Sequence, residues 1–374
     1  MKTALFLLGA FAVCVIAAAL VDVVPAARTW LLRIGIGSLP PEKAREAMCK
    51  KTLRWLRKMP AVPISDQTRF TLPERLRGTY KSRKVQSWQL AALMLGAGQA
   101  GQREALQAVQ DRLLTGDGAW KQPVDRPDIA LLAYALLRFA PDTDAVRPAM
   151  DAVYAFLCAQ ADGGTVPYDP RTTNKRFVDT VGMICPFLSL YAKTYDAPEA
   201  AALALRQLEE YTRLGLHPAT GLPSHAIRVP DGAPLGVYGW GRGCGWYALA
   251  LSEMLRCGVS EALEPAAAYA RAVMACQQPN GAWSRQLLAE AGGETSGTAM
   301  LGHLLAQLYF RTGEEKLRIS AQKAERFLYT AVRTNGEVDY AQGDTKGVGF
   351  YSARMTPSPA ALGFALLLSE ELNT

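Results

Sequence analysis

From residue 41 to the end of the chain, apolar residues recur with a period of about 3.6, and alternating apolar and polar runs are few. This pattern predicts a chain that is almost wholly helical, with loops where Gly, Pro, Asn and Asp gather. The predicted helices are Pro41–Lys58, Trp88–Ala97, Arg103–Thr115, Asp128–Ala140, Thr143–Ala161, Thr180–Tyr195, Glu199–Leu214, Gly245–Cys257, Glu261–Gln277, Thr295–Arg311, Glu314–Val332 and Pro357–Glu371.

The connections between these helices alternate in length. Short connections follow the even-numbered helices, and long connections follow the odd-numbered ones. In five of the long connections a glycine turn lies near an aromatic residue or a histidine, at Gly118, Gly164, Gly221, Gly281 and Gly336. Successive glycines are 46, 57, 60 and 55 residues apart, which indicates a diverged repeat of one helical hairpin.

A single hairpin cannot bury its apolar face alone, so neighbouring hairpins must stack. Six hairpins with alternating loop lengths predict an all-α fold, an (α/α)6 barrel, in which the hairpins form a closed toroid. An open solenoid would bury the same faces, but its terminal repeats would need polar caps, and the sequence has none. We therefore expect residues 28–374 to form one catalytic domain, with the long loops and the starts of the even-numbered helices around one mouth.

The first residues have the pattern of a targeting segment. Lys2 precedes an unbroken apolar run from Ala4 to Leu20, and small-residue sites follow at residues 17–19 and 25–27. Residues 1–27 are therefore predicted to be a signal peptide or an N-terminal membrane anchor. The protein is expected to be exported, either periplasmic or anchored in the membrane and facing the periplasmic or extracellular side. Whether the segment is cleaved stays open.

The charge pattern and the cysteine content argue against nucleic-acid binding and against a metal site. The net charge is +7, but Lys and Arg are scattered, and their densest patches lack the interleaved aromatic residues of a nucleic-acid surface. Nucleic acid is therefore not an expected partner. The cysteines form no CxxC pair and lie mostly within apolar helical patterns, so no metal site is expected.

The stretch from Arg176 to Phe187, RFVDTVGMICPF, places Asp179 at the opening of an apolar segment that contains Gly182 and Pro186. In a helix interior Gly costs roughly 1 kcal/mol and Pro about 3 kcal/mol relative to Ala. One interpretation is a helix whose first turn aims Asp179 into a cavity. The other is a helix that begins at Pro186, with Asp179 in the preceding loop.

The other residues at the predicted mouth mix Trp, Tyr, Asp and Arg, the side chains that a sugar site needs. They are Trp88, Asp125, Asp128, the run Trp240–Tyr247 (WGRGCGWY), the run Glu294–Thr298 (ETSGT), Tyr351 and Arg354. The forked guanidinium of Arg242 suits a carboxylate, although the neighbouring glycines can also serve close packing. His225 is a weaker candidate, and His217 and His303 are expected to be structural.

The motifs VDTVGMICPF, WGRGCGWYALAL and ETSGTAM, in this order, resemble the unsaturated glycosyl hydrolases of glycoside hydrolase families 88 and 105. The second of these families contains unsaturated rhamnogalacturonyl hydrolases. The resemblance implies an (α/α)6 barrel that acts on oligosaccharides with a 4,5-unsaturated uronic acid at the non-reducing end. It also implies hydration of the C4–C5 double bond, with no metal and no other cofactor.

The resemblance further implies roles for individual residues. Asp179 is the general acid and then the base, and an upstream carboxylate, Asp128 or Asp125, assists it. The substrate-binding residues are then His225, Trp240, Arg242, Trp246, Phe177 and Trp88. The sequence departs from the family pattern at Phe177, Thr180 and Cys244, and the aglycone sugar cannot be identified from the motifs.

Two other functions remain open from the sequence. One is another sugar-active (α/α)6 enzyme, such as an epimerase or a lyase, but only His225 among the histidines is well placed at the mouth. The other is a noncatalytic carbohydrate-binding relative, against which the presence of Asp179 and Arg242 argues. For Asp179 itself, the helix N-terminus favours the ionised carboxylate, whereas burial and a second carboxylate favour the neutral acid. We expect burial to prevail.

Overall fold

The computed structural model describes residues 2–84, 87–229, 231–289 and 291–373. Its α-helices in these ranges are α1 (Lys2–Ile34), α2 (Pro41–Arg57), α3 (Leu72–Leu76), α4 (Ser87–Gln99), α5 (Arg103–Leu113), α6 (Ile129–Phe139), α7 (Arg147–Gln160), α8 (Val178–Tyr195), α9 (Pro198–Gly215), α10 (Gly241–Cys257), α11 (Leu263–Met274), α12 (Thr295–Thr312), α13 (Glu315–Thr330) and α14 (Pro359–Leu372). The short strands are β1 (Val62–Pro63), β2 (Lys81–Ser82), β3 (Lys175–Phe177), β4 (Ala226–Arg228), β5 (Pro234–Leu235), β6 (Ala341–Gln342) and β7 (Met355–Thr356). Single 3₁₀ turns lie at Pro170–Thr172 and Ser260–Ala262.

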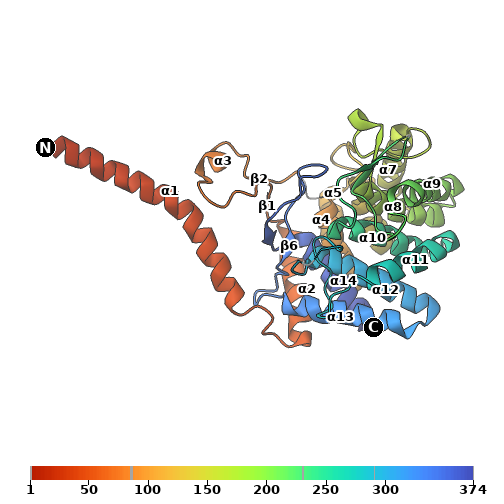
Figure 1. The fold of residues 1–374 in the computed structure, drawn as a ribbon. Helices are drawn as coiled ribbons and strands as arrows, with labels where there is room; N and C mark the ends of the chain where they lie inside the picture. Colours follow the sequence, from red (N-terminus) through yellow and green to blue (C-terminus); the bar gives the residue numbers. More distant parts are fainter. Residues whose placement is uncertain (1, 85–86, 230, 290, 374) are drawn as a thin grey trace.

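Two concentric layers of helices form the body of the molecule (Figure 1). The inner ring consists of α4, α6, α8, α10, α12 and α14, each packed against the next, and α14 packs against α4 to close the ring. The outer layer consists of α2, α5, α7, α9, α11 and α13. The predicted (α/α)6 barrel is therefore confirmed, and the open solenoid is excluded because the first and last inner helices are neighbours.

The distribution of apolar residues decides which helices lie inside. The inner helix α12 buries every residue from Thr295 to Leu308. The outer helix α5, in contrast, buries only Leu106 and Val109 and exposes its polar face to solvent. A helix that is apolar all round must be surrounded by other helices, whereas an amphipathic helix packs its apolar face on the core and leaves its polar face in solvent.

The repeated glycine turns join each hairpin to the next. Gly118, Gly164, Gly221, Gly281 and Gly336 all have positive φ, between 68° and 92°. A Cβ at Gly281 would lie 2.2 Å from the carbonyl oxygen of Lys323 in α13, the next outer helix. At Gly336 it would lie 2.1 Å from that of Ala47 in α2, so the last turn packs on the first outer helix. Only glycine fits both the backbone conformation and the contact.

The long loops gather at the N-terminal ends of the inner helices, as predicted, but they are not irregular throughout. They carry the short strands, which pair antiparallel as β1–β2, β3–β4–β5 and β6–β7. Most helix boundaries lie within three residues of the predicted ones, and two helix starts differ by four residues. Helix α10 begins at Gly241, not at Gly245, and α7 begins at Arg147, not at Thr143, because the side chain of Asp142 accepts from the Asp144 amide and forms a turn there.

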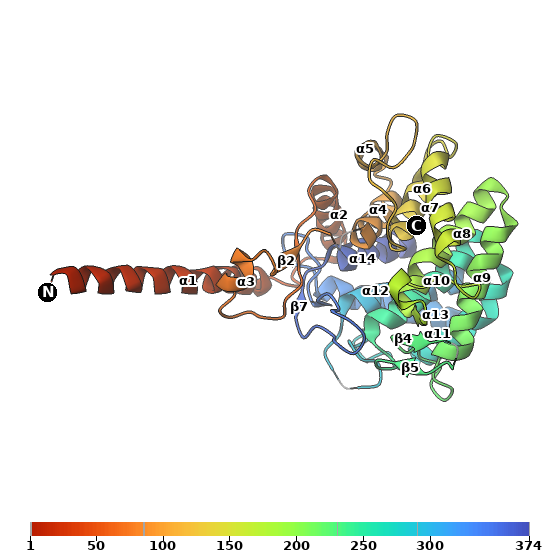
Figure 2. The ribbon, with the colours of Figure 1, turned by 90° about the horizontal axis from the view of Figure 1, so that it is seen from above.

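Helix α1 projects away from the barrel (Figures 1 and 2). It continues past residue 27 to Ile34, none of its residues is buried, and within the described ranges it is the one helix long and apolar enough to cross a membrane. Among the contacts that attach its C-terminal part to the rest of the protein are two polar ones. The Asp22 carboxylate accepts hydrogen bonds from Thr71, and Arg33 Nε lies 2.7 Å from Oδ2 of the buried Asp339.

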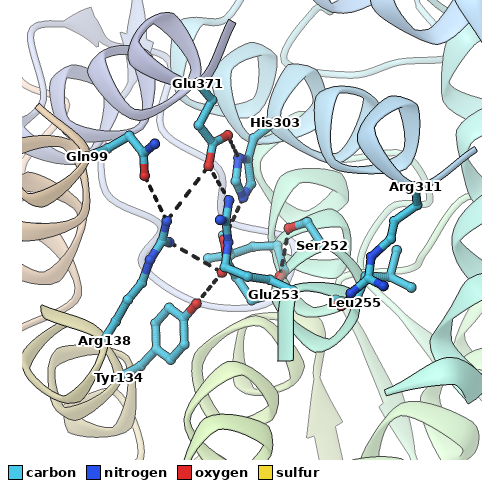
Figure 3. A network of polar contacts seen from close by, with 11 residues as sticks. Gln99, Tyr134, Arg138, Ser252, Glu253, Leu255, His303, Arg311 and Glu371 are labelled. Carbon is cyan, nitrogen blue, oxygen red and sulfur yellow. Dashed lines mark hydrogen bonds and ion pairs between the residues drawn. The ribbon is translucent and has the colours of Figure 1, made fainter. Parts of the chain in front are cut away.

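A buried ionic network lies among the C-terminal halves of the inner helices, away from the mouth (Figure 3). His303 Nδ1 is 2.6 Å from Glu371 and Nε2 is 2.5 Å from Glu253. Glu253 also accepts from Tyr134 and lies beside the guanidinium of Arg138. Burial alone would lower the pKa of His303, but the two carboxylates together raise it. The expectation that His303 is structural is therefore confirmed.

Candidate functional site

A cavity of about 360 Å³ opens at the mouth of the barrel. Seven of the eight residues predicted for the site line it: Trp88, Phe177, Asp179, His225, Trp240, Arg242 and Trp246. The remaining predicted residue, Asp128, is not part of the lining. Side chains that the sequence did not single out complete the wall: Tyr168, Asp169, Thr172, Met183, Asp344, Thr345 and Lys346.

Asp179 lies in the first turn of α8, which begins at Val178 and contains Pro186 in its interior. The interpretation that the helix starts at Pro186 is therefore wrong. Gly182 has a packing role, because a Cβ there would lie 2.5 Å from the carbonyl oxygen of Trp246 in α10. The glycine allows α8 and α10 to approach closely, and this approach brings Asp179 and Arg242 to the same cavity.

Pairing of β3 with β4 brings His225 to Asp179. Phe177 pairs with Ala226, and the amide of Val178 donates to the carbonyl oxygen of His225 at 3.0 Å. As a result, His225 Nε2 lies 3.6 Å from Asp179 Oδ2. The sequence placed both residues at the mouth, but only this strand pairing sets them side by side.

The environment of Asp179 keeps its carboxyl group poorly solvated. The side chain is 21% exposed, and its Oδ2 atom is buried with no hydrogen-bond partner among the described residues. Burial raises the pKa of Asp179, and the neighbouring His225 and Arg242 oppose this rise without reversing it. The pKa of Asp179 is therefore raised, as expected, and burial is the dominant cause.

His225 is a buried neighbour of Asp179, and its charge depends on pH. Burial lowers the pKa of His225, an effect that Asp179 opposes and Arg242 reinforces. Its Nδ1 atom lies 3.1 Å from the hydroxyl of Tyr351, and its ring packs at 4.5 Å from that of Trp240. Tyr351 therefore orients the imidazole. The sequence indicated only that Tyr351 lies near the mouth.

Arg242 is buried and its guanidinium lies near the rings of Trp88 and Trp240, at 5.8 and 5.4 Å from their centroids. It donates to the carbonyl oxygens of Gln342 and Gly343 and to the hydroxyl of Thr345. These three acceptors are all neutral. The positive charge of Arg242 is therefore fixed in place at the cavity, where it can meet an anionic ligand.

Gln342 is a positioning residue that the sequence did not reveal. Its side chain accepts from Trp240 Nε1 at 2.8 Å, while its backbone carbonyl accepts from Arg242 at 2.6 Å. The backbone amide of Gln342 donates to the carboxylate of Glu294. The same carboxylate accepts from the backbone amides of Ser296 and Gly297 in the first turn of α12. The ETSGT motif thus caps α12 and holds β6, and it does so without lining the cavity.

The two candidate assisting carboxylates differ in burial. Asp125 has a side chain that is 77% exposed. Asp128 is buried, its Oδ1 atom has no hydrogen-bond partner in the described part of the chain, and burial raises its pKa. Burial is the main cause that raises the pKa of the Tyr168 phenol in the cavity wall, and the charges of Asp128 and Asp179 add to this rise. The geometry favours Asp128 over Asp125.

A further carboxylate, Asp344, lines the cavity in the loop after β6. Burial raises the pKa of Asp344, and Arg242 opposes the rise. Its charge in turn disfavours ionisation of Asp179. No sequence motif marks Asp344, because its place depends on the bonds that Arg242 makes to the same loop. Among the residues described, no group of three or more His, Cys, Asp or Glu side chains is arranged to hold a metal ion.

The profile of glycosyl hydrolase family 88 matches residues 90–372. A comparison with curated proteins finds no matching sequence. Among solved structures, a possible member of glycoside hydrolase family 105 from Salmonella enterica subsp. enterica serovar Paratyphi A has a TM-score of 0.73 at 17% identity, over 90% of this chain and 95% of that one.

Two unsaturated glucuronyl hydrolases are also similar in structure. One is specific for heparin and has a TM-score of 0.67 at 13% identity, over 89% of this chain and 96% of that one. The other, from Bacillus sp. GL1, is responsible for the degradation of glycosaminoglycan and has a TM-score of 0.62 at 16% identity, with the same coverage. At these identities the likeness establishes a common fold.

Proposed function

Because this chain belongs to glycosyl hydrolase family 88, we propose that it removes a 4,5-unsaturated uronic acid from the non-reducing end of lyase-generated oligosaccharides. The observation that carries the proposal is the state of Asp179. Its carboxyl group faces a sugar-sized cavity, and burial raises its pKa, so that the group can hold a proton for delivery to a substrate.

The proposed reaction is hydration of the C4–C5 double bond. The acid form of Asp179 gives its proton to C4, which leaves an oxocarbenium-like centre at C5. Water adds at C5 and returns a proton to the Asp179 carboxylate. The resulting hemiketal opens by cleavage of the bond between C5 and the ring oxygen, and the hemiacetal left at C1 then releases the rest of the sugar chain as an alcohol. Positioned proton transfer of this kind contributes about 10²–10⁴-fold to the rate.

The walls of the cavity have separate proposed roles. Arg242, held by neutral acceptors, pairs with the uronate carboxylate. Trp88, Trp240 and Trp246 present aromatic surface to the apolar side of the sugar ring, as does Phe177. His225, oriented by Tyr351, contacts a substrate hydroxyl, and Asp128 assists Asp179 from behind the wall.

The protein is also proposed to be exported and to remain attached to the membrane through α1. The helix is long and apolar enough to span a bilayer. The bond between Asp22 and Thr71 supports retention, because cleavage after Ala27 would remove Asp22. The barrel then lies on the periplasmic or extracellular side, where lyase products are available.

The full chain, in a nonionic detergent, is to be incubated with unsaturated oligosaccharides of the pectin, hyaluronan and xanthan types. Hydration removes the ultraviolet absorbance of the double bond, and we expect its loss with the wild type, most rapidly with a rhamnose aglycone. Saturated oligosaccharides of the same composition should remain intact. After cell fractionation the activity should be found with the membranes. Persistence of the absorbance with every unsaturated substrate would refute the proposal.

The activity should fall as the pH rises. The acid form of Asp179 is the proton donor, and its pKa lies above the ordinary value of 3.8, so kcat/KM should decrease as the pH rises through this raised pKa. His225 lowers the pKa of Asp179, and a His225→Gln variant should therefore move this limb to higher pH. A pH–rate profile of each protein checks both statements. If kcat/KM of the two proteins falls over the same pH range, His225 does not lower the pKa of Asp179.

A further inference from the structure

A second cavity, of about 370 Å³, adjoins the first at the mouth. The two share Trp88, Arg242 and Asp344, so that these side chains stand between them. One wall of the second cavity is formed by the C-terminal part of α1, which contributes Arg28. The opposite walls come from the β1–β2 segment and from the segment that contains β6 and β7.

The lining of this second cavity is strongly basic. It contains Arg28, Lys81, Arg242, Arg333 and Arg354, against two carboxylates, Glu337 and Asp344. Arg333 is neutralised, because it pairs with Glu337 at 2.9 Å and with Asp339 at 2.6 Å. Among the other cations, Arg28, Lys81 and Arg354 form no ion pair with a described residue, whereas Arg242 lies near the Asp344 carboxylate.

Arg354 donates to the carbonyl oxygen of Ser65 and to the hydroxyl of Tyr80, both neutral acceptors, as Arg242 does with its own partners. Arg28 and Lys81 are exposed at the rim, and neither forms an ion pair with a described residue. Three cations without an ion pair among the described residues therefore face this cavity, together with Arg242, which lies near the Asp344 carboxylate and also faces the reaction site. Such an arrangement attracts and orients an anion.

We propose that the second cavity binds an acidic sugar unit in the remote part of the substrate, beyond the sugar that is released next to the unsaturated uronic acid. This inference rests on the proposed function. The preferred substrates are then acidic oligosaccharides longer than a disaccharide, and the ligand group is a carboxylate on a remote sugar. The aromatic side chains of Trp55 and Trp88 in the lining offer stacking surface to the same chain.

The position of α1 makes this site dependent on the N-terminal segment. Arg28 lies in the C-terminal part of α1, beyond the apolar run Ala4–Leu20, and the pair between Arg33 and Asp339 fixes this end of the helix against the barrel. The segment that carries the membrane anchor therefore also forms part of the substrate-binding surface. Its basic residues, and not only its apolar residues, have a function.

The test compares two substrates of the full chain in nonionic detergent: an unsaturated disaccharide with a neutral aglycone and an unsaturated tetrasaccharide with an acidic remote sugar. For the wild type, the ratio of kcat/KM for the acidic substrate to that for the neutral one should exceed one and should fall with added salt. In an Arg28→Gln/Lys81→Gln variant this ratio should decrease by about five- to tenfold, through KM, since each lost pair between an exposed charge and its ligand is a small term.

A Lys50→Gln/Lys316→Gln variant is the matched control, because it removes two exposed charges from the outer helices, outside both cavities. Its ratio should equal that of the wild type. An unchanged ratio in the Arg28/Lys81 variant, or an equal decrease in the control, would overturn the inference.

Binding without turnover separates this inference from the proposed function. Calorimetric titration with a saturated acidic tetrasaccharide needs no hydration step. Weaker binding to the Arg28→Gln/Lys81→Gln variant than to the wild type and the control supports the second site even if neither unsaturated substrate is hydrated. Equal binding to all three proteins, or none to the wild type, rejects the site.

Discussion

An Asp179→Asn variant is expected to lose hydration of unsaturated disaccharides, with kcat reduced by about 10²–10⁴-fold. The amide has nearly the shape of the carboxyl group but cannot donate the proton that C4 requires. The fold should persist, because Oδ2 of Asp179 has no hydrogen-bond partner among the described residues to lose. The ultraviolet absorbance of the substrate measures the rate, and circular dichroism checks the fold.

The matched control is Asp125→Asn, which changes an exposed carboxylate at the same mouth. Its activity should equal that of the wild type. Asp128→Asn should lower the rate, because Asp128 is the proposed assisting carboxylate and is buried, with no hydrogen-bond partner for its Oδ1 atom among the described residues. If Asp179→Asn removes the absorbance as fast as the wild type, Asp179 is not the general acid, even though the family assignment stands.

The second large effect concerns stability. A Glu253→Gln variant is expected to lower the free energy of unfolding by about 3–5 kcal/mol, because it removes the charge of a fully buried carboxylate from an ionic network. Burial raises the pKa of Glu253, but Arg256, Arg138 and His303 reverse this and hold the pKa well below its usual value. The carboxylate is thus ionised in the folded protein. Denaturation by urea, followed by circular dichroism, measures the change.

Glu46→Gln provides the control for this change, since Glu46 forms an exposed pair with Lys50 on α2. The urea midpoint of this variant should match that of the wild type. Equal midpoints for the Glu253 and Glu46 variants would contradict a stabilising role for the ionic network and leave His303 without its structural function.

Much of the fold follows from the sequence because its causes are local. The period of the apolar residues predicted each barrel helix, and the difference between helices that are apolar all round and helices that are apolar on one face decides the inner and outer layers. The alternating loop lengths placed Asp179, Arg242 and Trp88 at one end. The strands in the loops were not predicted, because they are two or three residues long and depend on partners distant in the chain.

The candidate site was predicted as a set of residues but not as an arrangement. Asp179 is followed by Gly182 and Pro186, and Arg242 is flanked by glycines. Gly and Pro are unfavourable in helix interiors, so their presence indicated that these stretches serve more than packing. The sequence placed Tyr351 at the mouth without giving it a role, and no local feature distinguishes Gln342 in β6 or Asp344 in the loop that follows. Tyr351 bonds to His225, and Gln342 bonds to Trp240 and Arg242. Asp344 lies between Gly343 and Thr345, which both accept from Arg242. Only the closed ring brings these partners within reach.

The helical repeat, the order of the ring and the end of the barrel that carries the site follow from the amino-acid sequence, since they depend on local periodicity and on glycine turns. The folded arrangement was needed to learn which carboxylate is buried, that His225 lies beside Asp179, and that α1 borders a basic second cavity. Burial, electrostatic coupling and cavity shape depend on distances through space. Residues far apart in the chain set those distances, and no local pattern encodes them.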